Sequence, residues 1–261
     1  METARKIIAG ITAVAMAFVF VGVGFLACIV PPVTHGLSSV FALDDLSPFD
    51  RSQLVKVADA TRDYSFGAHD ELALYRTIYE VDREFQASLN EAGGMVPADF
   101  PALAAVRDAG NVEQYRQAFA HASELYCYSP ATLSHLDDCH AIASAAYPAL
   151  VAIAILAVAG LAFTGVTAGG RRFGTVLLAA GVIVLALFVV LGVWAAIDFT
   201  GLFNAFHHVF FAQQGNWTFP YDSLLICSLP QPFWAGMAAV WLGASVVLSI
   251  VSILIGRRLK R

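Results

Sequence analysis

The chain has 261 residues, of which 58% are hydrophobic and 13% are charged, and its mean hydropathy is +0.68. Soluble proteins carry about 25% charged residues, so this composition excludes a soluble enzyme and a disordered protein. The 15 lysines and arginines are outnumbered by 20 aspartates and glutamates. The absence of a basic balance excludes a nucleic-acid-binding protein as well.

The apolar residues gather in four long runs, at 7–30, 149–170, 173–197 and 233–256. Each run reaches the roughly 20 residues that a helix needs to cross a bilayer. Only helices or closed barrels satisfy the backbone within lipid. We therefore predict an all-α polytopic membrane protein with four transmembrane helices.

Residues 1–30 are expected to form an N-terminal tail and the first transmembrane helix. A short basic start followed by an apolar run also describes a signal peptide, and the tetrapeptide Phe25–Cys28 approximates a bacterial lipobox. The run is long and three more runs follow it. These two features favour an uncleaved helix.

Residues 31–148 are too numerous for a simple linker, so we expect a folded extracytoplasmic cap. Apolar residues recur at helical spacing in Ser52–Tyr64, Leu72–Leu89 and Asn111–Tyr126, and strand-like alternation is absent. A fourth helix is predicted to begin after Ser129, a favoured N-cap, with Pro130 at its first position. The cap is thus predicted to be helical.

Three of the four cysteines lie in the predicted outer segments, which permit disulfides. They are Cys127, Cys139 and Cys227. The sequence does not choose among the pairings. Cys127–Cys139 closes the shortest loop and is the pairing we favour.

Residues 198–232 lie between the third and fourth predicted spans. Their first part carries an apolar stripe formed by Phe199, Leu202, Phe203, Phe206, Val209 and Phe210. A Phe-rich amphipathic helix beside a span belongs in the membrane interface. At 100° per residue His207 falls at the border of the stripe and His208 on the far side, so His207 is expected at the depth of lipid ester groups. Asp198 is expected to mark a helix end, and Trp217, Tyr221 and Trp234 fit an interfacial aromatic belt.

The bases outside the long loop define the orientation. They are Arg5, Lys6, Arg171, Arg172, Arg257, Arg258, Lys260 and Arg261. All of them lie on one side of a four-helix topology, and the positive-inside rule makes that side cytoplasmic. We expect a multi-pass protein of a bacterial cytoplasmic membrane with both termini, including the basic tail 257–261, in the cytoplasm.

The sequence contains no G-x-S-x-G, HExxH, P-loop or dinucleotide-binding motif. The outer histidines remain as candidates, and two interpretations are open. One is a zinc site formed by His135, Asp138, Cys139 and His140, closed by His207 or His208. The other is general acid–base catalysis by imidazole, whose pKa near 6.5 suits it to proton transfer.

Two motifs of this chain resemble a known family. Phe206–Phe211, then Trp217, Pro220–Asp222, Leu225–Ile226, Leu229–Pro230 and Phe233 resemble the C-terminal signature of the bacterial lipoprotein intramolecular transacylases, called Lit. The segment Ser134–Asp138 resembles the cap motif of that family. The family layout of four spans, with a large outer segment between the first two, also matches.

The resemblance implies an enzyme that moves the sn-2 acyl chain of a lipoprotein's diacylglyceryl-cysteine to the α-amino group of that cysteine. It implies His135 and His207 as catalytic residues on the outer face. Supporting residues would be Asp138, which is one turn from His135, together with Phe210, Phe211, Trp217 and Asp222. The implied partners are diacylated lipoproteins and membrane lipid.

Such a reaction requires no cofactor and no metal. The amine nucleophile is tethered to the ester, which supplies proximity, and its pKa near 8 is within reach of one imidazole base. Two other functions stay open on sequence alone. One is a non-enzymatic membrane protein with a binding or sensor cap, and the other is a metal-dependent membrane hydrolase.

Overall fold

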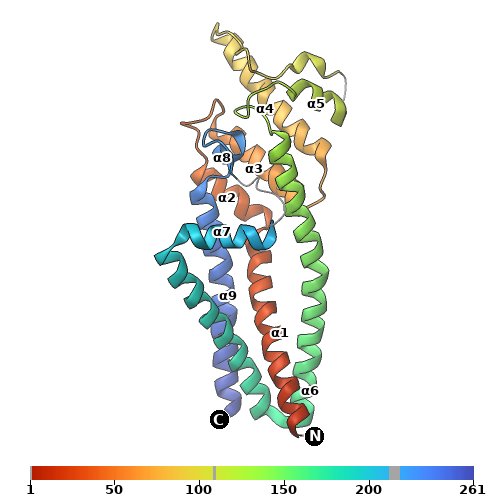
Figure 1. Cartoon of the computed structure of the whole chain (residues 1–261), viewed down its shortest axis with the longest axis vertical. Helices are drawn as coiled ribbons and strands as arrows, with labels where there is room; N and C mark the ends of the chain where they lie inside the picture. Colours follow the sequence, from red (N-terminus) through yellow and green to blue (C-terminus); the bar gives the residue numbers. More distant parts are fainter. Residues whose placement is uncertain (1, 108–109, 212–217) are drawn as a thin grey trace. The chain divides into compact units, whose positions relative to one another are not determined.

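The computed structural model describes residues 2–107, 110–211 and 218–261. Within these ranges every regular secondary-structure element is helical (Figure 1). The chain divides into two compact units, each described by itself. Unit 1 contains residues 1–28, 144–210 and 238–261, and unit 2 contains residues 29–143 and 211–237. The all-helical prediction is confirmed.

Three helices are long and apolar enough to cross a membrane. They are α1 (Glu2–Cys28), α6 (Pro130–Ile197) and α9 (Gln231–Lys260). A straight helix of the 68 residues of α6 would be about 100 Å long, but one residue within it, Gly169, has non-helical angles (φ 76°, ψ 173°). Glycine adopts positive φ without steric cost, and α6 turns back on itself there (Figure 1).

Unit 1 is held together by close helix contacts that depend on small residues. A Cβ added at Gly256 of α9 would lie 2.5 Å from the carbonyl oxygen of Gly174 in α6, so the two backbones touch. Trp241 of α9 donates a hydrogen bond from Nε1 to the carbonyl oxygen of Val21 in α1 at 2.8 Å. Small residues and interhelical hydrogen bonds are the usual means by which helices associate in lipid.

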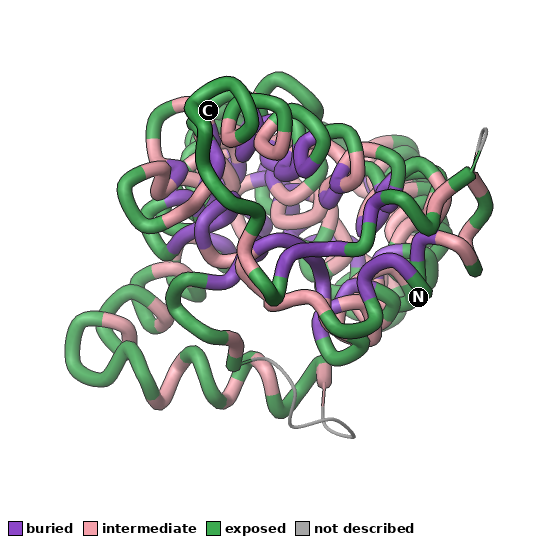
Figure 2. The backbone as a smooth tube through the Cα atoms, turned by 90° about the horizontal axis from the view of Figure 1, so that it is seen from above, coloured by how far each residue is buried: buried purple, intermediate pink, exposed green. Residues whose placement is uncertain are grey.

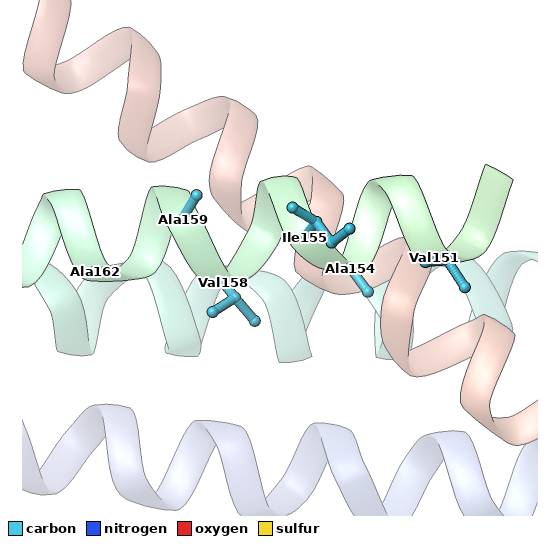
Figure 3. Close-up of a pocket in the computed structure, with 6 residues that line it drawn as sticks. All are labelled: Val151, Ala154, Ile155, Val158, Ala159 and Ala162. Atoms are coloured by element: carbon cyan, nitrogen blue, oxygen red, sulfur yellow. The ribbon is translucent and has the colours of Figure 1, made fainter. Parts of the chain in front are cut away.

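The outward side of α6 is apolar. Six of its residues line a shallow pocket to which no other element contributes, namely Val151, Ala154, Ile155, Val158, Ala159 and Ala162 (Figure 3). An apolar helix surface of this kind is compatible with contact to acyl chains.

Unit 2 is built around α3 (Arg51–Phe66), which contacts α2 (Pro31–Phe41), α4 (Glu71–Glu91) and α8 (Leu224–Ser228). Asp50 and Gln53 form a reciprocal capping box at the start of α3. Such a box satisfies two amides that a helix start leaves unpaired. Side chains from α3 and α4 fill the core, including Leu54, Val57, Leu74, Ile78 and Val81.

The predicted helices of this region are found with small differences. Ser52–Tyr64 and Leu72–Leu89 correspond to α3 and α4, and Pro130 begins α6 with Ser129 Oγ accepting from the Thr132 amide at 3.2 Å. The helix predicted over 111–126 ends earlier, because α5 covers only Val112–Phe119. Beyond it the chain turns, and the Ser123 amide donates to the carbonyl of Asp99.

The favoured disulfide is absent, because all four cysteines are free thiols. Cys127 is buried, and its sulfur faces the carbonyl oxygens of Phe119, Ala122 and Ser123. Cys139 lies on α6, with its sulfur 3.8 Å from Nε2 of His135. Short loop length therefore did not bring the two sulfurs together. The reason is that Cys127 is directed into the turn after α5.

Candidate active site

His135 is presented by the second turn of α6, in unit 2. Its ring centroid lies 5.0 Å from that of Phe211 and 5.6 Å from that of Phe219, with both rings tilted. The imidazole is half-buried in this aromatic setting. The structure thus brings together two residues that the sequence motifs single out, His135 and Phe211, and adds Phe219, which the sequence analysis did not identify.

The two aspartates after His135 have different surroundings. Asp138 lies one turn further along α6 and is half-buried. Asp137 is exposed and accepts a hydrogen bond from the hydroxyl of Tyr64 in α3. Burial, together with this bond, raises the pKa of Tyr64, so the phenol is a neutral donor. The motif therefore connects α6 to α3 through Asp137.

His207 belongs to α7 (Phe199–Phe210), in unit 1. Its Nδ1 lies 2.8 Å from the carbonyl oxygen of Phe203, and its ring lies 4.0 Å from the ring of Phe203. A carbonyl can only accept, so Nδ1 carries the proton. In the neutral ring Nε2 is then the nitrogen with the lone pair. This geometry prepares His207 to take a proton at Nε2.

The α7 helix begins directly after α6, and one residue joins them. Asp198 donates its amide to the carbonyl of Trp194 at 2.8 Å, and its carboxylate accepts from the Gly201 amide at 2.8 Å. Asp198 is thus the helix-end residue that the sequence predicted. None of the residues of α7 is buried within the structure (Figure 2). Its phenylalanines remain exposed, as expected of a helix whose apolar side meets lipid.

The other supporting candidates are distributed differently. Phe210 is 48% exposed and packs against Phe206 at 4.8 Å between ring centroids. Asp222 is exposed in the turn before α8. Trp217 lies outside the described residues. His135 and His207 belong to different units, and each has its own aromatic surroundings.

The zinc interpretation receives no support from the geometry of unit 2. Over the residues that the structure describes, no three His, Cys, Asp or Glu side chains are grouped so as to hold a metal ion. His140, which that interpretation placed beside His135, is stacked on His69 instead, at 3.9 Å between ring centroids. The sequence gave no sign of this stack, because its two histidines are far apart along the chain.

Two comparisons identify related proteins. A family model described as "Lipoprotein intramolecular transacylase Lit" matches residues 111–234. The solved structure of the membrane integral lipoprotein intramolecular transacylase Lit from Bacillus cereus has a similar fold, with a TM-score of 0.68. These matches support the Lit family. The structural match has 15% identity and covers 99% of this chain and 97% of the Lit chain, and at that identity it concerns the fold.

The Lit match also agrees with the family that the sequence motifs indicate. The range 111–234 contains His135, Asp138, His207, Phe210, Phe211, Trp217 and Asp222. No match was found among curated proteins. A transacylase that acts in a membrane on lipoproteins is the function class that these comparisons support.

Proposed function

We propose that this protein transfers the sn-2 acyl chain of a diacylglyceryl-cysteine to the α-amino group of the same cysteine, which gives a lyso-form lipoprotein. The observation that carries the proposal is the hydrogen bond between His207 Nδ1 and the carbonyl of Phe203. This bond leaves Nε2 as the basic nitrogen on a helix whose exposed phenylalanines suit the depth of lipid esters.

The proposed step conserves atoms and charge. The α-amine attacks the sn-2 ester carbonyl, a C–N bond forms and the ester C–O bond breaks. One imidazole accepts the amine proton, and the other protonates the departing glycerol oxygen or stabilises the tetrahedral oxyanion. His135 and His207 fill these two roles. The tethered amine supplies proximity, so no enzyme nucleophile, cofactor or metal is needed.

The supporting residues have simpler roles in this scheme. Asp138, one helical turn after His135, orients that ring and favours its protonated form. Phe210, Phe211 and Trp217 provide apolar surface for acyl chains, and Asp222 supports the segment before α8. The substrates are diacylated lipoproteins presented in the membrane.

For the topology we propose four crossings, because the turn at Gly169 divides α6 into two apolar parts. Arg171 and Arg172 follow that turn, on the same side as both basic termini. Both termini then lie in the cytoplasm of a bacterial cell, and the chemistry takes place on the outer face. Cysteine introduced at Ala92 should react with an impermeant reagent added to intact cells, and cysteine at Gly170 should not. Reversed labelling would refute this orientation.

The direct test of function is mass spectrometry of the N-terminal peptide of a lipoprotein. Purified protein is incubated with a synthetic diacylated lipopeptide, with and without EDTA. We expect a product of unchanged mass in which the acyl group has moved to nitrogen, formed equally with the chelator present. A product shortened by one acyl chain, lost with EDTA and restored by zinc, would instead establish the metal-dependent hydrolase. No product with active Lit as a positive control would favour a binding or sensor protein.

A further inference from the structure

Three aromatic rings are stacked against α6 in unit 2. Tyr64 of α3 stacks on His69 with ring centroids 4.2 Å apart and planes at 23°. His69, from the connection between α3 and α4, stacks in turn on His140 of α6 at 3.9 Å and 17°. The three rings join segments that are distant in sequence.

Polar contacts fix this stack on a second residue of α6. His69 Nδ1 donates to the carbonyl oxygen of Tyr64 at 3.0 Å, and its Nε2 lies 3.6 Å from Oδ1 of Asp137. The same carboxylate oxygen accepts from the hydroxyl of Tyr64. Asp137 and His140 of α6 are therefore both held by the pair Tyr64 and His69.

His69 adopts an unusual backbone conformation. Over the described ranges it is the one residue other than glycine with a positive φ, 56°. A side chain with a Cβ is disfavoured in this left-handed region. Strained residues persist where surrounding contacts fix them, and they cluster at functional sites. The ring of His69 is therefore held in place at a conformational cost that glycine would avoid.

The stack and His135 lie on opposite sides of one helix. At 100° per residue, Asp137 and His140 are centred about 170° from His135. His135 faces Phe211 and Phe219 on its own side. Rotation of the helix by about 10° would move a ring that is about 6 Å from the axis by about 1 Å. A displacement of that size can lower a reaction rate by about 100-fold.

We propose that His69 is a positioning residue, which through its stack on His140 and its contact with Asp137 fixes the rotation of α6 and so the direction of His135. This inference rests on the proposed transacylase function. It assigns to His69 a role in turnover and none in binding, because His69 contacts the back of the helix.

The test uses His69→Gly in the full-length protein. Glycine adopts the left-handed conformation without strain, so we expect the melting temperature to be unchanged or higher. We expect kcat on the diacylated lipopeptide to fall at least tenfold with KM unchanged. His121→Gly, at an exposed turn residue of the same unit, is the matched control and should keep full activity.

A second pair of variants separates stacking from stability. His140→Phe retains a ring that can stack, whereas His140→Leu retains apolar bulk without one. We expect His140→Phe to keep kcat, and His140→Leu to show the loss seen for His69→Gly. The double variant His69→Gly with His140→Leu should be no worse than either one, because both act through one contact.

Equal kcat in the two His140 variants would overturn the proposal, as would full kcat in His69→Gly. Failure of the underlying function would look different, because the unmodified protein would then form no lyso-form product.

Discussion

Nδ1 of His207 and the carbonyl oxygen of Phe203 lie 2.8 Å apart, one turn from each other on α7. This bond fixes the tautomer of His207, and its loss would free the ring to rotate. It therefore provides a way to separate the orientation of the side chain from its basicity.

His207→Asn tests that separation, because the asparagine amide can donate to the same carbonyl but cannot accept a proton near neutral pH. We expect product formation to fall by about 100-fold or more, the usual contribution of a general acid or base, with helix content unchanged. His208→Asn, at the exposed neighbouring position, is the control and should keep most activity. Equal activity of the two variants would refute the assignment of His207.

The second prediction concerns Asp82, which is fully buried in α4. Both of its carboxylate oxygens are buried without a hydrogen-bond partner. Desolvation raises the pKa of Asp82 to about 9, far above the ordinary value near 3.9. The folded state therefore holds a proton that the unfolded state releases. The contribution of Asp82 to stability is complete below about pH 4 and declines as the pH rises towards 9.

Asp82→Asn should remove this dependence and raise the melting temperature at pH 8 relative to the unmodified protein. In the sensitive range the free energy of unfolding changes by up to about 1.4 kcal/mol per pH unit. Glu84→Gln on the same helix is a control of opposite sign, because hydrogen bonding to Lys56 lowers the pKa of Glu84. Thermal melts in detergent from pH 5 to 9 measure both. A lower melting temperature for Asp82→Asn at pH 8 would contradict the prediction.

The third prediction follows from the four free cysteines. Burial raises the pKa of Cys127 to about 12 and of Cys227 to about 11, so neither is an appreciable thiolate at pH 8. We expect slow alkylation of the native protein. In denaturant without a reducing agent, all four cysteines should react, as counted by mass spectrometry. Two unreactive cysteines would show that a disulfide is present.

The fourth prediction concerns the contact between Gly174 and Gly256. A Cβ on Gly256 would lie 2.5 Å from the carbonyl oxygen of Gly174 and 2.8 Å from the amide nitrogen of Leu178. Backbone atoms cannot rotate away, so Gly256→Ala should lower the free energy of unfolding by about 1–3 kcal/mol. Gly243→Ala, on the same helix with open space around it, should be neutral or stabilising. Equal melting temperatures in detergent would argue against this helix contact.

Local sequence rules predicted much of the helical structure. Ser129 and Pro130 begin α6 as their cap preferences indicate, and apolar spacing located α3 and α4. The short α2 and α8 were not predicted, because neither has a periodic pattern long enough to recognise. Propensity also extended α5 past Phe119, where contacts with the segment around Asp99 turn the chain.

The candidate site was predictable only in part. The histidines and Phe211 stand within recognisable motifs, whereas Phe219 reaches His135 from a segment without a local signal. The pairing of His69 with His140 depends on how α6 packs on α3, which no local pattern encodes. Cys127 shows the converse case, in which proximity in sequence suggested a bond that side-chain direction prevents.

The joint at Asp198 makes the direction of α7 depend on the length of α6. Because the same residue ends one helix and starts the next, insertion of one residue between Gly169 and Asp198 would turn the departure of α7 by about 100° and shift it by about 1.5 Å. His207 would then point elsewhere even though no residue near it had changed. Among homologues, this stretch should therefore vary freely in sequence while conserving its number of residues.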